Sequence, residues 1–256
     1  SLRERLNIAV SPKIEGIFSL DDVEESMLDG YFNGQERGTT TYVKQIDHAW
    51  TWRNGEVNIW TGYQNEGKSM FLNQLSCLKA YHDSWKFGVF SPENMPMNDY
   101  FNDIIEMYVG MSADPYYKNN HMSIKVYKKA MAFVRKHFFL IYPKKDFTLD
   151  NIFSRAKFLV KTKGIRSLII DPDVNRIKGG GTFSDKADNV MFIWRPNRAL
   201  DFSDTSVIFG SQKIKKQKLV GVPQEIHGIH FDVRTQRYMF NNHTPFSEID
   251  EKRSKS

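Results

Sequence analysis

One short stretch of this chain has the residue types and the spacing to hold a polyphosphate. Residues 62–69 read Gly-Tyr-Gln-Asn-Glu-Gly-Lys-Ser and match the pattern G-x-x-x-x-G-K-[ST] at every fixed position. In such a loop the glycines let backbone N–H groups approach the phosphates, Lys68 reaches the β and γ oxygens, and the Ser69 hydroxyl holds Mg²⁺. The sequence therefore predicts ATP or another nucleoside triphosphate, with Mg²⁺, as the ligand. The predicted nucleotide contacts are Gly62, Asn65, Gly67, Lys68, Ser69 and Met70.

The segments on either side of the loop are those that this chemistry requires. Val57, Ile59 and Thr61 alternate as in a strand, and apolar residues recur at helical spacing from Met70 to Leu78. The N-terminus of a helix presents unpaired N–H groups and the positive end of a dipole to the phosphates. A chance turn rich in glycine is the alternative, and the strand and helix argue against it.

Strand and helix patterns alternate along the rest of the chain, which predicts an α/β fold. Short apolar runs such as residues 167–171 are typical of strands covered on both faces, so we expect a mainly parallel central sheet flanked by helices around the P-loop. The predicted strands are 85–90, 138–142, 167–171, 190–194 and 206–210, the predicted helices are 98–110 and 149–163, and a C-terminal β-hairpin follows at 226–232 and 236–240.

Three regions are expected along the chain: an N-terminal helical arm at 1–40, the ATPase core at 41–240, and a disordered polar tail at 241–256. Ser19 and Asp22 form a capping-box start in the arm, and an apolar stripe that includes Met27 and Tyr31 follows. That stripe must pack on its own core or on a neighbouring subunit, and the sequence favours neither.

Charge and composition limit the partners and the compartment. A net charge of +6 and a pI near 9.2 fit a polyanion such as nucleic acid, with an ordinary solvated cationic face as the alternative. The lone cysteine, Cys77, excludes an internal disulfide and a cysteine-rich zinc site, and we expect it in the core. No apolar run suggests a membrane span or a signal peptide, so we expect a cytoplasmic protein without a membrane partner.

Two carboxylates follow predicted strands. Asp171 ends the apolar run 167–171, at the strand edge where open α/β sheets bind ligands, and we expect it to hold Mg²⁺ through water. Glu93 follows the strand that ends at Phe90, and its carboxylate could orient or deprotonate an attacking water. An ordinary strand-end aspartate and an ordinary loop glutamate are the alternatives, and for Glu93 spacing alone leaves both readings open.

Further stretches carry a family resemblance. Residues 90–94, 187–195, 212–215, 221 and 231–232, together with the phosphate loop and Asp171, resemble the RecA-like motor domain of DnaB- and Twinkle-type replicative ring helicases over about residues 15–240. The helicase half of phage primase-helicases is most similar. The resemblance implies an ATP-driven DNA helicase that translocates on single-stranded DNA as a homo-oligomer, a ring of six, with a fused or partner primase. A RecA-like recombination or repair ATPase and a degenerate nucleotide-binding scaffold are the rivals.

The resemblance also implies roles for individual residues. Glu93 matches the catalytic glutamate, and Arg195 falls where the family has an arginine near the nucleotide base. Lys213 and Lys215 fall where the family has a lysine and an arginine finger that complete the neighbouring subunit's site. A lysine at 215 supplies charge without the bidentate fork of arginine, which puts efficient stimulation in doubt. A solvated basic run over 213–218 is the alternative.

The glycine-rich stretch at Lys178, Gly179, Gly180 and Gly181 resembles the end of a DNA-facing loop, although a flexible linker fits equally well. The family places a further helix and strand, which carries a polar sensor residue, between the magnesium aspartate and this loop. Here only about ten residues intervene, fewer than the dozen or more that a parallel crossover needs. Either a central strand has been lost or the sequence lacks an internal stretch. We favour the second, because losing a central strand would disrupt the sheet.

Overall fold

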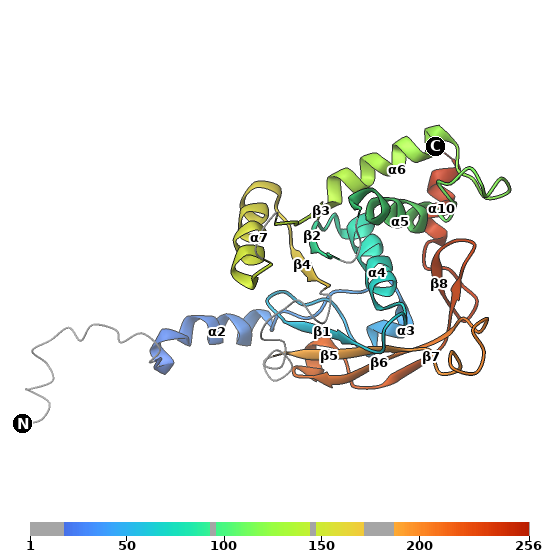
Figure 1. The fold of residues 1–256 in the computed structure, drawn as a ribbon. Coiled ribbons are helices and arrows are strands. Elements are labelled where there is room, and N and C mark those ends of the chain that lie inside the picture. Colours follow the sequence, from blue (N-terminus) through green and yellow to red (C-terminus); the bar gives the residue numbers. More distant parts are fainter. Residues whose placement is uncertain (1–17, 93–95, 144–146, 172–186, 256) are drawn as a thin grey trace, which may run out of the picture. The chain divides into compact units, whose positions relative to one another are not determined.

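The computed structural model describes residues 18–92, 96–143, 147–171 and 187–255 (Figure 1). The chain divides into two units, Ser1–Arg37 and Gly38–Ser256. The described part of the first unit is a 3₁₀ turn, η1 (Leu20–Asp22), followed by helix α2 (Glu24–Asn33). The backbone N–H of Ser19 donates to the Asp22 carboxylate over 2.9 Å, as the capping-box pattern predicts.

The arm helix α2 buries none of its side chains. Its apolar residues and those of the preceding turn are all exposed, and they are Phe18, Leu20, Val23, Met27, Leu28, Tyr31 and Phe32. Acidic residues, including Asp21 and Glu24, accompany them, and no basic residue lies between Phe18 and Asn33. An apolar and acidic helix of this kind needs a partner surface to be stable.

The second unit contains two sheets. The larger has the strand order β1-β5-β6-β7-β8; β1 and β5 are parallel and the other pairs antiparallel. Its strands are β1 (Asn58–Thr61), β5 (Asn189–Trp194), β6 (Ser206–Ile214), β7 (Glu225–Asp232) and β8 (Arg237–Phe240). The smaller sheet has the order β3-β2-β4 and is entirely parallel. Its strands are β2 (Phe87–Phe90), β3 (Phe138–Leu140) and β4 (Ser167–Ile170).

The predicted α/β architecture with parallel strands and flanking helices is confirmed, but the described strands form two hydrogen-bonded sheets and not one. Strands β1 and β4 are both edge strands, and no described residue forms a strand between them. The chain passes from β4 to β5 through residues 172–186, which lie outside the described residues. The connection that the sequence analysis found too short for a parallel crossover therefore lies where the two sheets separate. Both β1 and β4 form despite it.

Helix α4 joins the two sheets through one core. Phe71 and Leu75 of α4 are fully buried, and Phe71 stacks on Phe209 of β6 with ring centroids 5.6 Å apart. The same apolar cluster includes Phe87 of β2 and Ile169 of β4. In Figure 1, α4 lies between the five-stranded sheet and helices α5 and α6. The long helices are α4 (Lys68–Asp83), α5 (Met97–Val109), α6 (Ile124–His137) and α7 (Leu149–Lys163); the short ones are α3 (Lys44–Asp47) and α9 (Gln217–Val220).

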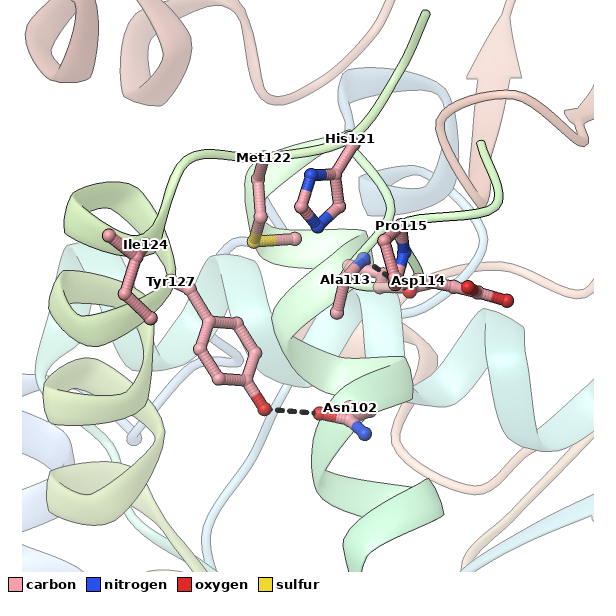
Figure 2. A pocket seen from close by; sticks show the side chains of 9 residues that line it. Asn102, Ala113, Asp114, Pro115, His121, Met122, Ile124 and Tyr127 are labelled. Carbon is pink, nitrogen blue, oxygen red and sulfur yellow. Dashed lines mark hydrogen bonds between the residues drawn. The ribbon is translucent and has the colours of Figure 1, made fainter. Parts of the chain in front are cut away.

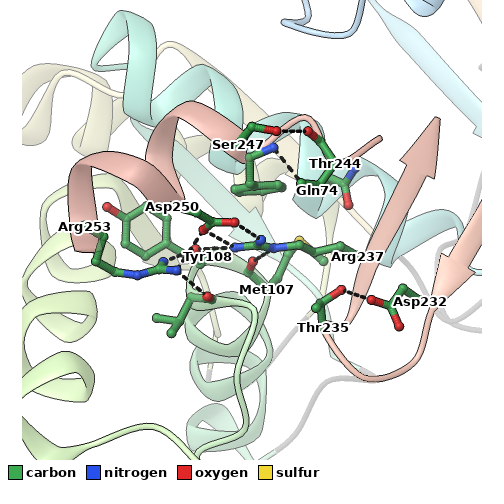
Figure 3. A network of polar contacts seen from close by, with 12 residues as sticks. Gln74, Met107, Tyr108, Asp232, Thr235, Arg237, Thr244, Ser247, Asp250 and Arg253 are labelled. Atoms are coloured by element: carbon green, nitrogen blue, oxygen red, sulfur yellow. Dashed lines mark hydrogen bonds and ion pairs between the residues drawn. The ribbon is translucent and has the colours of Figure 1, made fainter. Parts of the chain in front are cut away.

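The expected disorder after residue 240 is also wrong, because the C-terminal segment folds into α10 (Ser247–Ser254). Phe246 and Ile249 anchor it in the core. Its Asp250 carboxylate pairs with the buried guanidinium of Arg237 over 2.7 Å (Figure 3). Arg237 also donates to the carbonyls of Met107 and Tyr108 at the end of α5. Two apolar anchors and one partly buried ion pair thus fix a segment whose composition is mostly polar.

Candidate nucleotide-binding site

The phosphate loop connects β1 to α4, as its sequence pattern requires. Gly62 and Gly67 have φ values of 140° and 87°, and Asn65 has 60°. A Cβ atom on Gly62 would lie 2.2 Å from the carbonyl oxygen of Ile193, and one on Gly67 would lie 2.0 Å from the Tyr238 hydroxyl. Both glycines are therefore required by backbone conformation and by close approach.

Several groups outside the motif hold the loop in place. The buried Tyr238 hydroxyl donates to the carbonyl of Gly67 over 3.0 Å, and burial raises the Tyr238 pKa, so the phenol stays protonated as a donor. The Arg195 backbone N–H donates to the buried Glu66 carboxylate. The Arg198 guanidinium donates to the carbonyls of Gln64 and Asn65. No short motif marks Tyr238 or Arg198, because only the folded sheet brings them to the loop.

The side chain of Lys68 lies over the loop itself. Its Nζ donates to the carbonyls of Gly62 and Tyr63, at 3.1 and 2.7 Å. The ammonium group is thus within a few ångströms of the turn that its motif assigns to phosphate. Met70 follows in the first turn of α4 and is partly buried against the core.

Ser69 and Asp171 meet at the mouth of the loop. The Ser69 hydroxyl donates to Asp171 Oδ2 over 2.6 Å, and the Ser91 hydroxyl lies 3.3 Å from the same oxygen. The Asp171 backbone N–H donates to the carbonyl of Phe90, which extends the β2–β4 pairing to this point. Hydroxyl and carboxylate oxygens are the ligands that Mg²⁺ prefers, so the residues present fit this ion.

Glu93 and the stretch Lys178, Gly179, Gly180 and Gly181 lie outside the described residues. The pairing of Phe90 with Ile170 places the end of β2 beside Asp171, and Glu93 follows Ser91 by two positions in the chain. Their roles stay predictions.

Lys213 and Lys215 are far from the phosphate loop of their own chain. Sheet register aligns Asn58, Asn189 and Ile214 at one end of β1, whereas Thr61, Phe192 and Gly210 align at the loop end. Both lysines are exposed, and Lys215 Nζ lies 2.9 Å from Asp188 Oδ1. Within one chain the two lysines and the phosphate loop therefore lie at opposite ends of the sheet.

Comparisons with known proteins agree with this architecture. No family model matches the chain. Over 179 residues it is 29% identical to the Twinkle homolog protein, chloroplastic/mitochondrial, of Arabidopsis thaliana, which covers 67% of this chain and 25% of that relative. A solved structure described as an ATPase domain is similar with a TM-score of 0.59 at 10% identity, covering 88% of this chain and 99% of that one. This chain has the fold of a DnaB/Twinkle-type motor domain.

A structure described as a DnaB-like replicative helicase and its interactions with primase is also similar to this chain. Its TM-score is 0.57 at 11% identity, over 93% of this chain and 70% of that one. The chain spans about a quarter of the length of the curated relative that it matches. In the described part of the chain, no helix is both long and apolar enough to cross a bilayer.

Proposed function

We propose that this motor domain hydrolyses ATP to drive a ring-forming DNA helicase. The observation that carries the proposal is the meeting of Ser69 and Asp171 at the end of a correctly formed phosphate loop, with Lys68 over that loop. These groups come from α4 and from the end of β4, so their convergence is a property of the fold and not of the loop sequence alone. A glycine-rich turn formed by chance would not require Ser69 and Asp171 to meet.

The chain's own residues divide the work of nucleotide binding. Lys68 exchanges the carbonyls of Gly62 and Tyr63 for phosphate oxygens, and Ser69 with Asp171 holds Mg²⁺, the latter through water. When bound, Mg²⁺ neutralises charge that develops on the phosphates. Glu93 orients or deprotonates the attacking water, since phosphoryl transfer is catalysed mainly by positioning and by charge stabilisation.

The far position of Lys213 and Lys215 supports a site completed by a second copy. The Cα atoms of Asn58 and Thr61, at the two ends of β1, are three steps of about 3.3 Å apart, or about 10 Å, which is more than the reach of one lysine back to its own loop. We infer that both lysines serve the nucleotide of the neighbouring subunit, and that Arg195 lies near the base. The exposed apolar and acidic arm gives a second reason to expect self-association, since it needs a partner surface.

The remaining parts of the proposal rest on resemblance. Lys178 and the three glycines after it bind the backbone phosphates of single-stranded DNA, independently of base sequence. A ring of six copies and a primase, fused or separate, complete the assembly. The proposal fits the cationic composition of the chain.

The decisive test is ATP hydrolysis by the purified chain with and without single-stranded DNA, with oligomer mass measured in the same buffer. We expect DNA to stimulate hydrolysis in a species of six chains. Lys68→Ala should abolish turnover, whereas Lys161→Ala, on exposed α7, should not. Strand displacement on a forked substrate separates a helicase from a recombination ATPase. Absence of turnover in every species would instead support a nucleotide-binding scaffold.

A further inference from the structure

Helix α6 carries a one-sided cationic face. It contains Lys125, Lys128, Lys129, Arg135 and Lys136, and no acidic residue. All five are exposed, and their spacing of three, four and seven places them along one side of the helix. Lys125, Lys128, Arg135 and Lys136 form no ion pair with any residue in the described ranges.

The acidic residues of the neighbouring helix do not neutralise this face. Helix α5, which packs against α6, carries Asp99, Asp103 and Glu106. Burial raises the pKa of Asp103 to about 6, and the nearby carboxylates Glu106 and Asp99 contribute to the rise. A carboxyl paired with a cation of α6 would show the opposite shift. No ion pair joins the acids of α5 to α6 within the described ranges, so Lys125, Lys128, Arg135 and Lys136 stay available.

The loop that leads into α6 presents aromatic rings. Tyr116 and Tyr117 are 83% and 57% exposed, and their rings meet edge to face with centroids 5.6 Å apart. Asp114 accepts from the backbone N–H of Tyr116, and Asn120 donates to the carbonyl of Arg234 in the β7–β8 turn over 2.7 Å. These contacts restrain the backbone of the loop, which reduces the ordering that binding would require.

A cavity of about 500 Å³ lies at the N-terminal end of the same helix (Figure 2). Met122, Ile124 and the Tyr127 ring give it apolar walls. The Tyr127 hydroxyl donates to Asn102 Oδ1 over 2.7 Å, which leaves the Asn102 amide N–H groups to donate. Glu106 and Asp114 also line the cavity, and their carboxylates repel phosphate but accept from the N–H groups of an uncharged ring.

We propose that α6 and this cavity form a binding site for single-stranded DNA, separate from the nucleotide site. The cations of α6 bind backbone phosphates, the cavity takes one unstacked base, and Tyr116 and Tyr117 stack on others, a combination typical of single-strand binding. The polyanion is identified as DNA only because the proposed function already acts on DNA. An acidic protein would use the cations but would leave the aromatic rings and the cavity unexplained.

The first test measures how salt affects the affinity of the full chain for a fluorescent thymidine oligonucleotide. Lys128→Gln with Lys136→Gln should lower the slope of log K against log salt by about 1.4, or about 0.7 for each phosphate that is no longer neutralised. Lys157→Gln with Lys161→Gln removes the same charge from exposed α7 and should leave the slope unchanged. Equal slopes for the α6 pair and the wild type would overturn the proposal.

The second test addresses the cavity, with Ala113→Leu to fill it and an oligonucleotide that carries one abasic position in place of one base. When the abasic site is moved along the strand, the wild type should bind at least one abasic strand several-fold more weakly than the intact strand. Ala113→Leu should bind the abasic and intact strands equally. Equal binding by wild type would overturn the base pocket. Competition by polyglutamate as strong as by DNA would show a general polyanion surface and overturn the proposal.

Both tests run without nucleotide and also in the Lys68→Ala background. The α6 site should persist there, because it uses no residue of the phosphate loop. Failure of the proposed function appears as unaltered turnover in Lys68→Ala, whereas failure of this inference appears as an unaltered salt slope. The two outcomes are therefore distinguishable.

Discussion

The Ser69 hydroxyl lies 2.6 Å from Asp171 Oδ2, although the helix of Ser69 follows a strand of one sheet and Asp171 ends a strand of the other. The contact depends on the shared core around Phe71 and Phe87, because no described strand links β1 to β4. The metal side of the site is thus assembled across a split between sheets. Packing by α4 takes the place of strand pairing in aligning its two halves.

Asp171→Asn should weaken the magnesium dependence of nucleotide binding. The amide keeps the shape of the carboxylate but removes its charge, and loss of a group that supports a metal typically costs about 10- to 100-fold in affinity. A Mg²⁺ titration of ATP binding measures this effect. Asp201→Asn, in an exposed loop, is the control. An unchanged Mg²⁺ requirement would exclude Asp171 from the metal site.

Tyr238→Phe should lower ATP affinity without unfolding the chain. The ring keeps its packing against Phe71, whose centroid is 4.9 Å away, but the hydrogen bond to the Gly67 carbonyl is removed. If the lost hydrogen bond weakens the free energy of ATP binding by about 1 kcal/mol, Kd rises roughly fivefold. Tyr142→Phe, at an exposed position two residues after β3, should change nothing. Identical Kd values for the wild type and Tyr238→Phe would show that the loop does not need this support.

Lys215→Ala should abolish hydrolysis while leaving ATP binding intact, because we propose that Lys215 acts on the neighbouring subunit's nucleotide. Mixing it with Lys68→Ala tests this geometry, since the first variant keeps a complete phosphate loop and the second keeps the lysine. Their mixture should recover part of the turnover that each lacks. Lys216→Ala is the matched control on the same basic run. Mixed subunits that remain inactive, with mixed oligomers verified by mass, would contradict action between subunits.

Asp103→Asn should change the dependence of stability on pH. The folded pKa of about 6 lies above the ordinary value of 3.8, so between these values the folded state binds more protons and unfolding becomes easier as pH rises. The variant should lack that decline and be more stable at pH 7, by about 1 kcal/mol or less because solvent screens a partly exposed carboxyl. Urea unfolding at pH 4.5 and pH 7 checks the result. The same change in the free energy of unfolding between pH 4.5 and pH 7 in both proteins would contradict the raised pKa of Asp103.

Asp250→Ala should destabilise the fold by about 3 kcal/mol, since it leaves the guanidinium of Arg237 buried without its carboxylate. Arg237 is only 2% exposed, so water cannot replace that group. Glu248→Ala breaks an exposed pair with Lys252 on the same helix and should cost less than about 1 kcal/mol. Equal midpoints of urea unfolding for the two variants would show that α10 is not held through Arg237.

The sequence predicts the elements of this fold better than the way they pair. The phosphate loop, the helix at 149–163 and the convergence of Ser69 with Asp171 follow from local patterns and from the rule that parallel strands end at one sheet edge. The split between β1 and β4 does not, because no local pattern reports which strands become edges. The folding of α10 depends on Arg237, whose partner lies 13 residues away.

The residues that support the phosphate loop were harder to predict. Tyr238 reaches Gly67 across 171 positions of sequence, and Arg198 reaches Asn65 across 133. Neither lies in a recognisable motif, and their types are common on any strand or loop. Only the order of strands in the sheet brings them together.

Titration of ATP with Mg²⁺ into the wild type, Lys68→Ala and Asp171→Asn tests the site most directly, because it measures binding without requiring DNA or a ring. We expect saturable binding of one nucleotide per wild-type chain, and a Kd at least about tenfold higher in each variant. Equal affinity in all three proteins, or no binding by the wild type, would contradict a nucleotide site built from these residues.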